Sequence, residues 1–153
     1  MNPGLSNNST NPYLRTKILT ASPEELRLML YEGTIRFCHQ AKSALEKKDY
    51  EVFCNSLVRA QKIVLELSTS LRPELSPELC EKLNALYIYI YRRMVDANTN
   101  RDAAAIDEAI ELMGYEKETW QMLMQQLAES GGGGVSDVTS AQQTAISSLQ
   151  VNG

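Results

Sequence analysis

The side chains best suited to chemistry are one histidine, His39, and three cysteines, Cys38, Cys54 and Cys80. Imidazole and thiolate groups bind zinc and other transition metals, and both serve as nucleophiles or bases in catalysis. The spacing supports neither use, because no two cysteines form a Cys-x-x-Cys pair and no second histidine exists. We therefore expect reduced, buried thiols that pack as small hydrophobic side chains.

Two further patterns of catalytic or cofactor sites are incomplete. Di-iron helical bundles carry Glu-x-x-His on facing helices, but Arg36 stands three residues before His39. The glycine run 131–134 follows no predicted strand and lacks the Gly-Lys-Ser/Thr ending of a phosphate loop. The sequence predicts no enzyme activity, no cofactor and no metal, with His39 at the surface.

The chemistry that remains is apolar binding, centred on the run Leu-Tyr-Ile-Tyr-Ile-Tyr at residues 86–91. Alternating β-branched and aromatic residues resemble a strand, but the surrounding pattern is helical. A helix that is apolar all round can fill its own core with one face only. The opposite face must meet something else.

Composition narrows the class of partner. The chain has 153 residues, 43% of them hydrophobic and 22% charged, with a net charge of −4. A negative net charge argues against a nucleic-acid-binding protein, which normally carries a basic patch. The first twelve residues contain no apolar segment typical of a signal peptide, and the longest apolar run, 85–91, is far shorter than a membrane span. We expect a cytoplasmic protein without membrane insertion.

Helix start signals divide the chain into four long helices. Ser22-Pro23 with Glu25 forms a capping box, Ser76-Pro77 repeats the Ser-Pro start, and Asp49 and Asp102 are further N-caps. Short connections make consecutive helices antiparallel neighbours. The predicted fold is all-α, an antiparallel up-down-up-down four-helix bundle over residues 22–129. Flexible segments are predicted at 1–21 and at 130–153, which is rich in Gly, Ser, Thr and Gln.

Apolar positions recur every three or four residues and predict the buried face of each helix. These positions are Leu26, Leu30, Gly33, Phe37, Ala41 and Ala44; then Phe53, Leu57, Ala60, Val64, Leu67 and Leu71; then Leu79, Leu83, Leu86, Ile90, Met94 and Ala97; and Ile106, Ile110, Met113, Trp120, Met124 and Leu127.

Several large apolar residues remain outside these faces. On the second and third helices they are Val58, Leu65, Tyr87, Ile88, Tyr91 and Val95, and on the first they are Tyr31 and Ile35. Tyr87 lies nearest the buried face. One interpretation is a wide buried stripe, since isolated exposed apolar residues are normal. A second is a homodimer interface, and a third is a groove for a partner helix. The repetition on two consecutive helices favours the groove.

Short segments spread over residues 13–128 resemble one protein family in both order and interval. They are Thr20 to Leu26, Met29 to Gly33, Ala41 to Leu45, Lys48-Asp49, Ala60 to Ile63, Leu86 to Tyr89, Arg92-Arg93, Ala97-Asn98 and Trp120. The chain is similar here to the flagellin-specific export chaperones, the FliS family.

The resemblance implies a cytoplasmic helical-bundle chaperone without catalytic residues or cofactors. Its partner would be the carboxyl-terminal region of flagellin, kept from premature polymerisation and ready for flagellar type III secretion. Export-gate components are a further partner class. The family's amino-terminal segment can lie on the bundle and cover the binding groove. Tyr13, Leu14, Ile18 and Leu19 occupy that position here. The alternative function is a helical interaction or dimerisation module with no chaperone role.

Overall fold

The computed structural model describes residues 11–71, 73–74 and 76–130, and every regular element within them is an α-helix. The predictions of flexible ends at 1–10 and 131–153 lie outside the described residues. The five helices are α2 (Pro12–Thr20), α3 (Pro23–Glu46), α4 (Tyr50–Thr69), α5 (Pro77–Asn100) and α6 (Ala103–Glu129).

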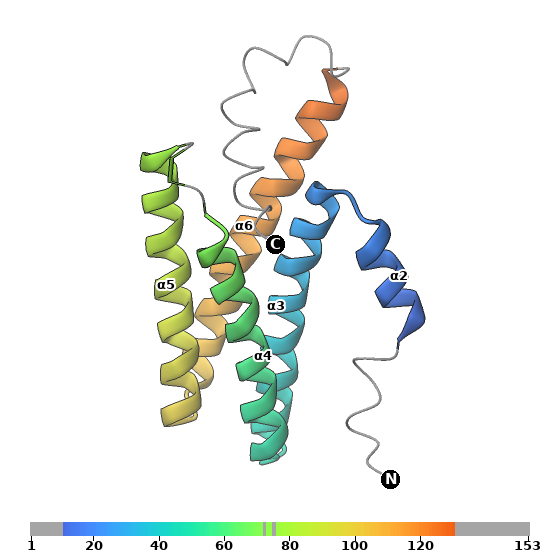
Figure 1. Ribbon diagram of the computed structural model, residues 1–153. Helices are drawn as coiled ribbons and strands as arrows, with labels where there is room; N and C mark the ends of the chain where they lie inside the picture. The colour runs from blue at the N-terminus through green and yellow to red at the C-terminus, as the bar shows by residue number, and fades with distance from the viewer. Residues whose placement is uncertain (1–10, 72, 75, 131–153) are drawn as a thin grey trace.

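Helices α3 to α6 form the predicted antiparallel bundle. Each packs on two others, so that α3 contacts α4 and α6, and α5 contacts the same two helices. Figure 1 shows the four helices side by side with α6 extending beyond the rest at one end. An all-α, up-down-up-down bundle is confirmed.

The predicted helix starts are also confirmed. The Ser22 hydroxyl accepts from the Glu25 amide, and the Glu25 carboxylate accepts from the Ser22 amide, each at 3.1 Å. Asp49 and Asp102 cap α4 and α6 by accepting backbone N–H groups. Such caps satisfy amides that have no partner inside the helix.

Residues 12–20, which lie within the segment predicted to be flexible, form helix α2. Its start uses the same chemistry as α3. The Asn11 side chain accepts from the amides of Tyr13 and Leu14, and Pro12 takes the first helical position. Proline is well suited there because its missing N–H would have no partner.

The predicted buried face of α4 is correct, and that of α3 is correct at Gly33, Ala41 and Ala44 but displaced by one residue at the other positions. Leu26, Leu30 and Phe37 are only half-buried. The deepest large side chains of α3 are instead Arg27 and Tyr31. Tyr31 therefore belongs to the core, and Ile35 packs against its edge.

Gly114 offers a direct test of helix propensity in α6. A Cβ added there would meet no atom within 4 Å. We expect Gly114→Ala to raise the free energy of unfolding by about 0.5–1 kcal/mol, because alanine loses less backbone entropy in a helix. Urea denaturation would measure the gain. A loss of stability would mean that the position needs glycine for a reason other than space.

Candidate functional site: an apolar stripe along α4 and α5

Two polar contacts fix the register of antiparallel helices α4 and α5. The Ser68 hydroxyl donates to Asn84 Oδ1 at 2.5 Å, and Asn98 Nδ2 donates to Cys54 Sγ at 3.6 Å. Both pairs have the same register: moving one residue toward the C-terminus of α4 moves the facing position one residue toward the N-terminus of α5. By this register Leu65 lies at the height of Ile88, within one residue.

The same register brings Val58 to the height of Val95, one helical heptad away along the bundle. Leu65 is 50% exposed, and Ile88 and Val95 are each 39% exposed. Val58 and Tyr91 are half-buried between these positions and the core. We call these five residues of α4 and α5 the apolar stripe: Val58, Leu65, Ile88, Tyr91 and Val95.

Tyr87 is a correction to the predicted binding surface, because its side chain is completely buried. Its hydroxyl accepts a hydrogen bond of 2.7 Å from Arg27 Nη2 and lies 3.4 Å from the Tyr31 hydroxyl. A phenol whose polar end reaches a partner inside the core can turn inward. Tyr87 therefore joins helices α3 and α5 and contributes nothing to the open stripe.

Arg27 is the centre of this buried cluster, with only 1% of its surface exposed. Its guanidinium carbon lies 5.1 Å from the centre of the Tyr31 ring and 5.3 Å from that of Trp120. Both distances fit cation–π contacts. Trp120 Nε1 also donates to the Glu24 carbonyl at 3.0 Å. The cluster connects α3, α5 and α6.

Burial dominates the electrostatics of the cluster. It raises the pKa of both the Tyr31 and Tyr87 hydroxyls, although the charge of Arg27 opposes the shift. Both phenols therefore remain neutral hydrogen-bonding groups. Burial also raises the pKa of the Glu116 carboxyl, again against the attraction of Arg27.

The raised pKa of Glu116 makes a prediction for pH. The folded chain binds the Glu116 proton more tightly than the unfolded chain, so this group destabilises the fold as pH rises above its ordinary value of 4.5. We expect Glu116→Gln to be more stable than wild type at neutral pH, with the difference shrinking as pH falls toward 4.5. Thermal unfolding across that range would measure it. A constant difference would contradict the assignment.

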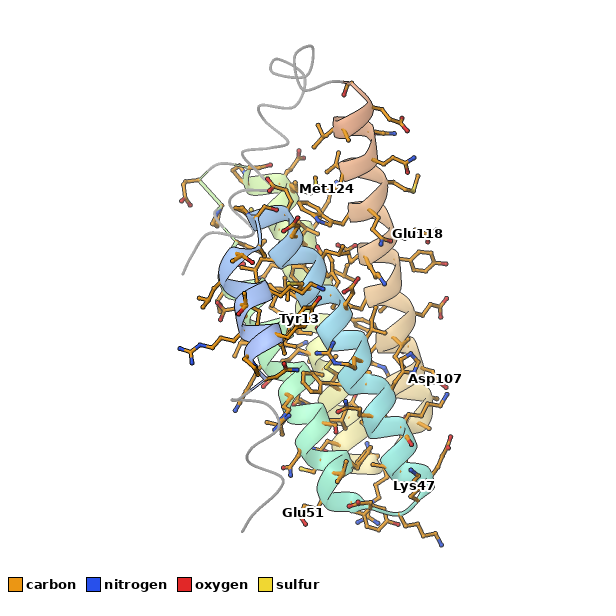
Figure 2. All side chains as sticks on the ribbon, turned by 90° about the vertical axis from the view of Figure 1, so that its right-hand side faces the viewer. Tyr13, Lys47, Glu51, Asp107, Glu118 and Met124 are labelled. Atoms are coloured by element: carbon orange, nitrogen blue, oxygen red, sulfur yellow. The ribbon has the colours of Figure 1, made fainter. Side chains whose placement is uncertain are left out.

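Helix α2 lies outside the bundle, against α3. Leu14 and Ile18 border a cavity of about 200 Å³ with Leu26, Leu30 and Ile63. Leu14 is half-buried, whereas Tyr13, Ile18 and Leu19 are exposed, and no residue of α2 is fully buried. Figure 2 shows α2 in front of α3 and α4, with Tyr13 labelled. The helix is weakly attached to the bundle.

The position of α2 differs from the predicted cover of the stripe. Figure 1 places α2 on the side of α3 that is away from α5. The stripe residues Ile88, Tyr91 and Val95 belong to α5, so α2 does not lie over them. Gly33 and Ile63 line the same cavity as Leu14 and Ile18 of α2, and a Cβ at Gly33 would stand 3.3 Å from Ile63 Cδ1. The open stripe and the α3–α4 face beneath α2 are thus two separate apolar surfaces.

Comparison with known proteins identifies the family. The family described as "Flagellar protein FliS" matches residues 6–127. The flagellar secretion chaperone FliS of Bacillus subtilis is 33% identical over 130 residues, covering 84% of this chain and 96% of that protein. The chain belongs to the FliS family of flagellar secretion chaperones.

Other FliS relatives support the same assignment. The flagellar secretion chaperones FliS of Campylobacter jejuni and Salmonella typhimurium are each 31% identical, over 76% and 72% of this chain and 91% and 82% of theirs. The FliS match includes both α2 and the bundle. FliS proteins are chaperones and not enzymes, as the sequence predicted.

The reactive side chains of this FliS-family chain fit that role. Cys38 and Cys80 are buried, Cys54 is half-buried, and none forms a disulfide. Burial raises the pKa of the Cys38 thiol to about 12, which keeps it protonated and unreactive. His39 is exposed, as predicted. Within the described residues, no group of three metal-binding side chains comes together, and no helix is long and apolar enough to cross a membrane.

Proposed function

We propose that this protein is a cytoplasmic chaperone that binds the carboxyl-terminal region of flagellin. Binding would cover the surface through which flagellin polymerises and keep the subunit competent for flagellar type III secretion. Membership of the FliS family supports the client, and the apolar stripe supports the binding mode. The single most important observation is the exposure of Leu65, Ile88 and Val95 on two adjacent helices.

An amphipathic helix would fit between α4 and α5. Residues seven positions apart on one helix are separated by about 10 Å, or two helical turns. Leu65 with Ile88, and Val58 with Val95, thus provide two apolar contacts at the spacing of a partner's own heptad. Covering these residues would remove apolar surface from water, which would stabilise the complex by about 25 cal/mol per Å² buried. Tyr91, which is half-buried, provides additional ring contact area.

The proposal is tested by mixing the full-length chain with the carboxyl-terminal region of flagellin from the same organism. Titration calorimetry should give a one-to-one complex, and stoichiometric chaperone should block flagellin polymerisation followed by light scattering. No detectable complex would refute the proposed client. A dimer of the chaperone that dissociates when the stripe is mutated would support the alternative, a dimerisation module.

We further propose that α2 competes with a client that wraps onto the α3–α4 face. Deleting residues 1–21 should speed flagellin binding and raise affinity by about tenfold or less. The limit follows because no residue of α2 is fully buried, so its docking can contribute only about 1 kcal/mol. Stopped-flow fluorescence of Trp120 would follow association.

The unfolding temperature of the deletion variant is the control, and it should stay near that of wild type because the bundle core is untouched. Unchanged binding kinetics would remove this role for Tyr13, Leu14, Ile18 and Leu19. Export-gate components are a second proposed partner class, to be tested by pull-down with the assembled chaperone–flagellin complex.

A further inference from the structure

Two basic side chains stand halfway along the apolar stripe. Lys62 follows Val58 by four residues and precedes Leu65 by three, and both it and Arg92 are exposed. Arg92 has the identical placement on α5, four after Ile88 and three before Val95. Residues three and four apart lie on the same side of a helix, so each cation lies between two stripe residues.

The register of α4 and α5 brings the two cations to the same level. Counting from the Cys54–Asn98 contact, Lys62 and Arg92 differ in height by two residues, or about 3 Å. Each lies farther from the helix interface than the stripe residues of its own helix, by the 100° step of a helix. Lys62 and Arg92, which we call the rim cations, therefore flank the apolar stripe on opposite sides at its midpoint.

Neither rim cation has an acidic partner among the described residues. Other basic side chains of the bundle do. Lys42 Nζ lies 2.7 Å from Asp107 Oδ1, and Arg93 Nε lies 2.8 Å from Glu108 Oε2. The nearest exposed carboxylates, Glu66 and Asp96, follow Lys62 and Arg92 by four residues, so they stand one helical turn away, on opposite sides of the midpoint. Asp96 is already paired with Arg93 at 3.3 Å. The middle of the apolar stripe thus has a positive side chain on each side.

We propose that the apolar stripe selects a helix with acidic side chains on both flanks, midway between two large apolar residues seven positions apart. This inference rests on the proposed function and specifies its client. The apolar residues of the partner would cover Leu65 with Ile88 and Val58 with Val95. Its carboxylates would then reach Lys62 and Arg92, and matching charges of this kind fix orientation and exclude wrong partners.

Two synthetic helical peptides test the charge requirement directly. They share leucines seven residues apart and differ only in the flanking residues midway, which are glutamate in one and lysine in the other. We expect the full-length protein to bind the glutamate peptide about tenfold more tightly, from two partly exposed ion pairs and the removal of two repulsive contacts. Added salt should reduce the preference. Equal binding of the two peptides, or binding of neither, would overturn the inference.

Charge reversal in the protein is the second arm. Lys62→Glu with Arg92→Glu should invert the order of the two peptides, while Lys47→Glu with Lys82→Glu, the same change at exposed sites off the stripe, should preserve it. Circular dichroism would verify that both variants fold. If flagellin binds but reversal changes nothing, the charge rule fails and the proposed function stands. If the peptides are discriminated but flagellin does not bind, the charge rule stands and the proposed client fails.

Discussion

Replacing Leu65 and Ile88 together with aspartate is expected to weaken flagellin binding at least about a hundredfold while the bundle stays folded. The two side chains are 50% and 39% exposed, so a docked helix would bury roughly half of each. Losing that burial and desolvating two carboxylates costs about 3 kcal/mol or more. Titration calorimetry with the flagellin region would measure the loss, and urea denaturation would confirm the fold.

A control variant replaces two exposed apolar residues on another face. Tyr115 and Met122 on α6 are 59% and 58% exposed and also lie seven residues apart. Tyr115→Asp with Met122→Asp makes the same change in charge away from the stripe, and this variant should bind flagellin as wild type does. Full affinity in the folded Leu65 and Ile88 variant would refute the stripe as the binding surface. Tyr91 is a poorer target because it packs against the core.

The largest expected effect on stability comes from Arg27→Ala, which should lower the free energy of unfolding by about 3–5 kcal/mol. The change removes two cation–π contacts, opens a cavity among Tyr31, Tyr87 and Trp120, and takes away the donor to the Tyr87 hydroxyl. A buried phenol that loses its partner is costly in itself. Guanidinium denaturation followed by Trp120 fluorescence would measure the loss.

The conservative variant Arg27→Met separates packing from charge. Methionine keeps much of the apolar stem of arginine, so it should fill most of the cavity and destabilise less than alanine. It also removes the cation near Glu116, whose pKa should rise further. If Arg27→Ala costs less than about 1 kcal/mol, the cluster does not stabilise the bundle as its geometry suggests.

The sequence predicted the bundle well because its local signals agree with one another. The caps at Ser22, Asp49 and Asp102 and the regular apolar face of α4 each depend only on neighbours in the chain. The stripe was found by the same reasoning, since helical periodicity shows which residues the core cannot use. The exposure of Leu65, Ile88 and Val95 follows from the antiparallel packing of α4 and α5.

The buried cluster could not be predicted from periodicity. Burying Arg27 is favourable only because Tyr31, Tyr87 and Trp120 arrive from three different helices to surround it. A rule that places hydrophobic side chains inward therefore chose Leu26 and Leu30 for α3, one residue from the true face. Periodicity also could not reveal the hydrogen bond from Arg27 to Tyr87, so Tyr87 was placed among the predicted binding residues.

Helix α2 was missed for a different reason. Its start signal, Asn11-Pro12, is of the same type as Ser22-Pro23 and is sufficient to predict a helix that begins at Pro12. Its position against Leu26 and Ile63 has no comparable signal. That position depends on weak contacts of Leu14 and Ile18 across the chain, which no local pattern encodes.

The rim cations also bear on how the chaperone behaves before it meets a client. Two identical copies can bury an exposed apolar surface by pairing about a twofold axis. An axis through the centre of the stripe would place the middle of one stripe against the middle of the other. Lys62 and Arg92 of each chain would then face the same positive charges in the second chain. Repulsion between these like charges disfavours a dimer formed through the stripe. The same charges would attract the acidic helix proposed above, so the free chaperone can stay monomeric with its stripe exposed.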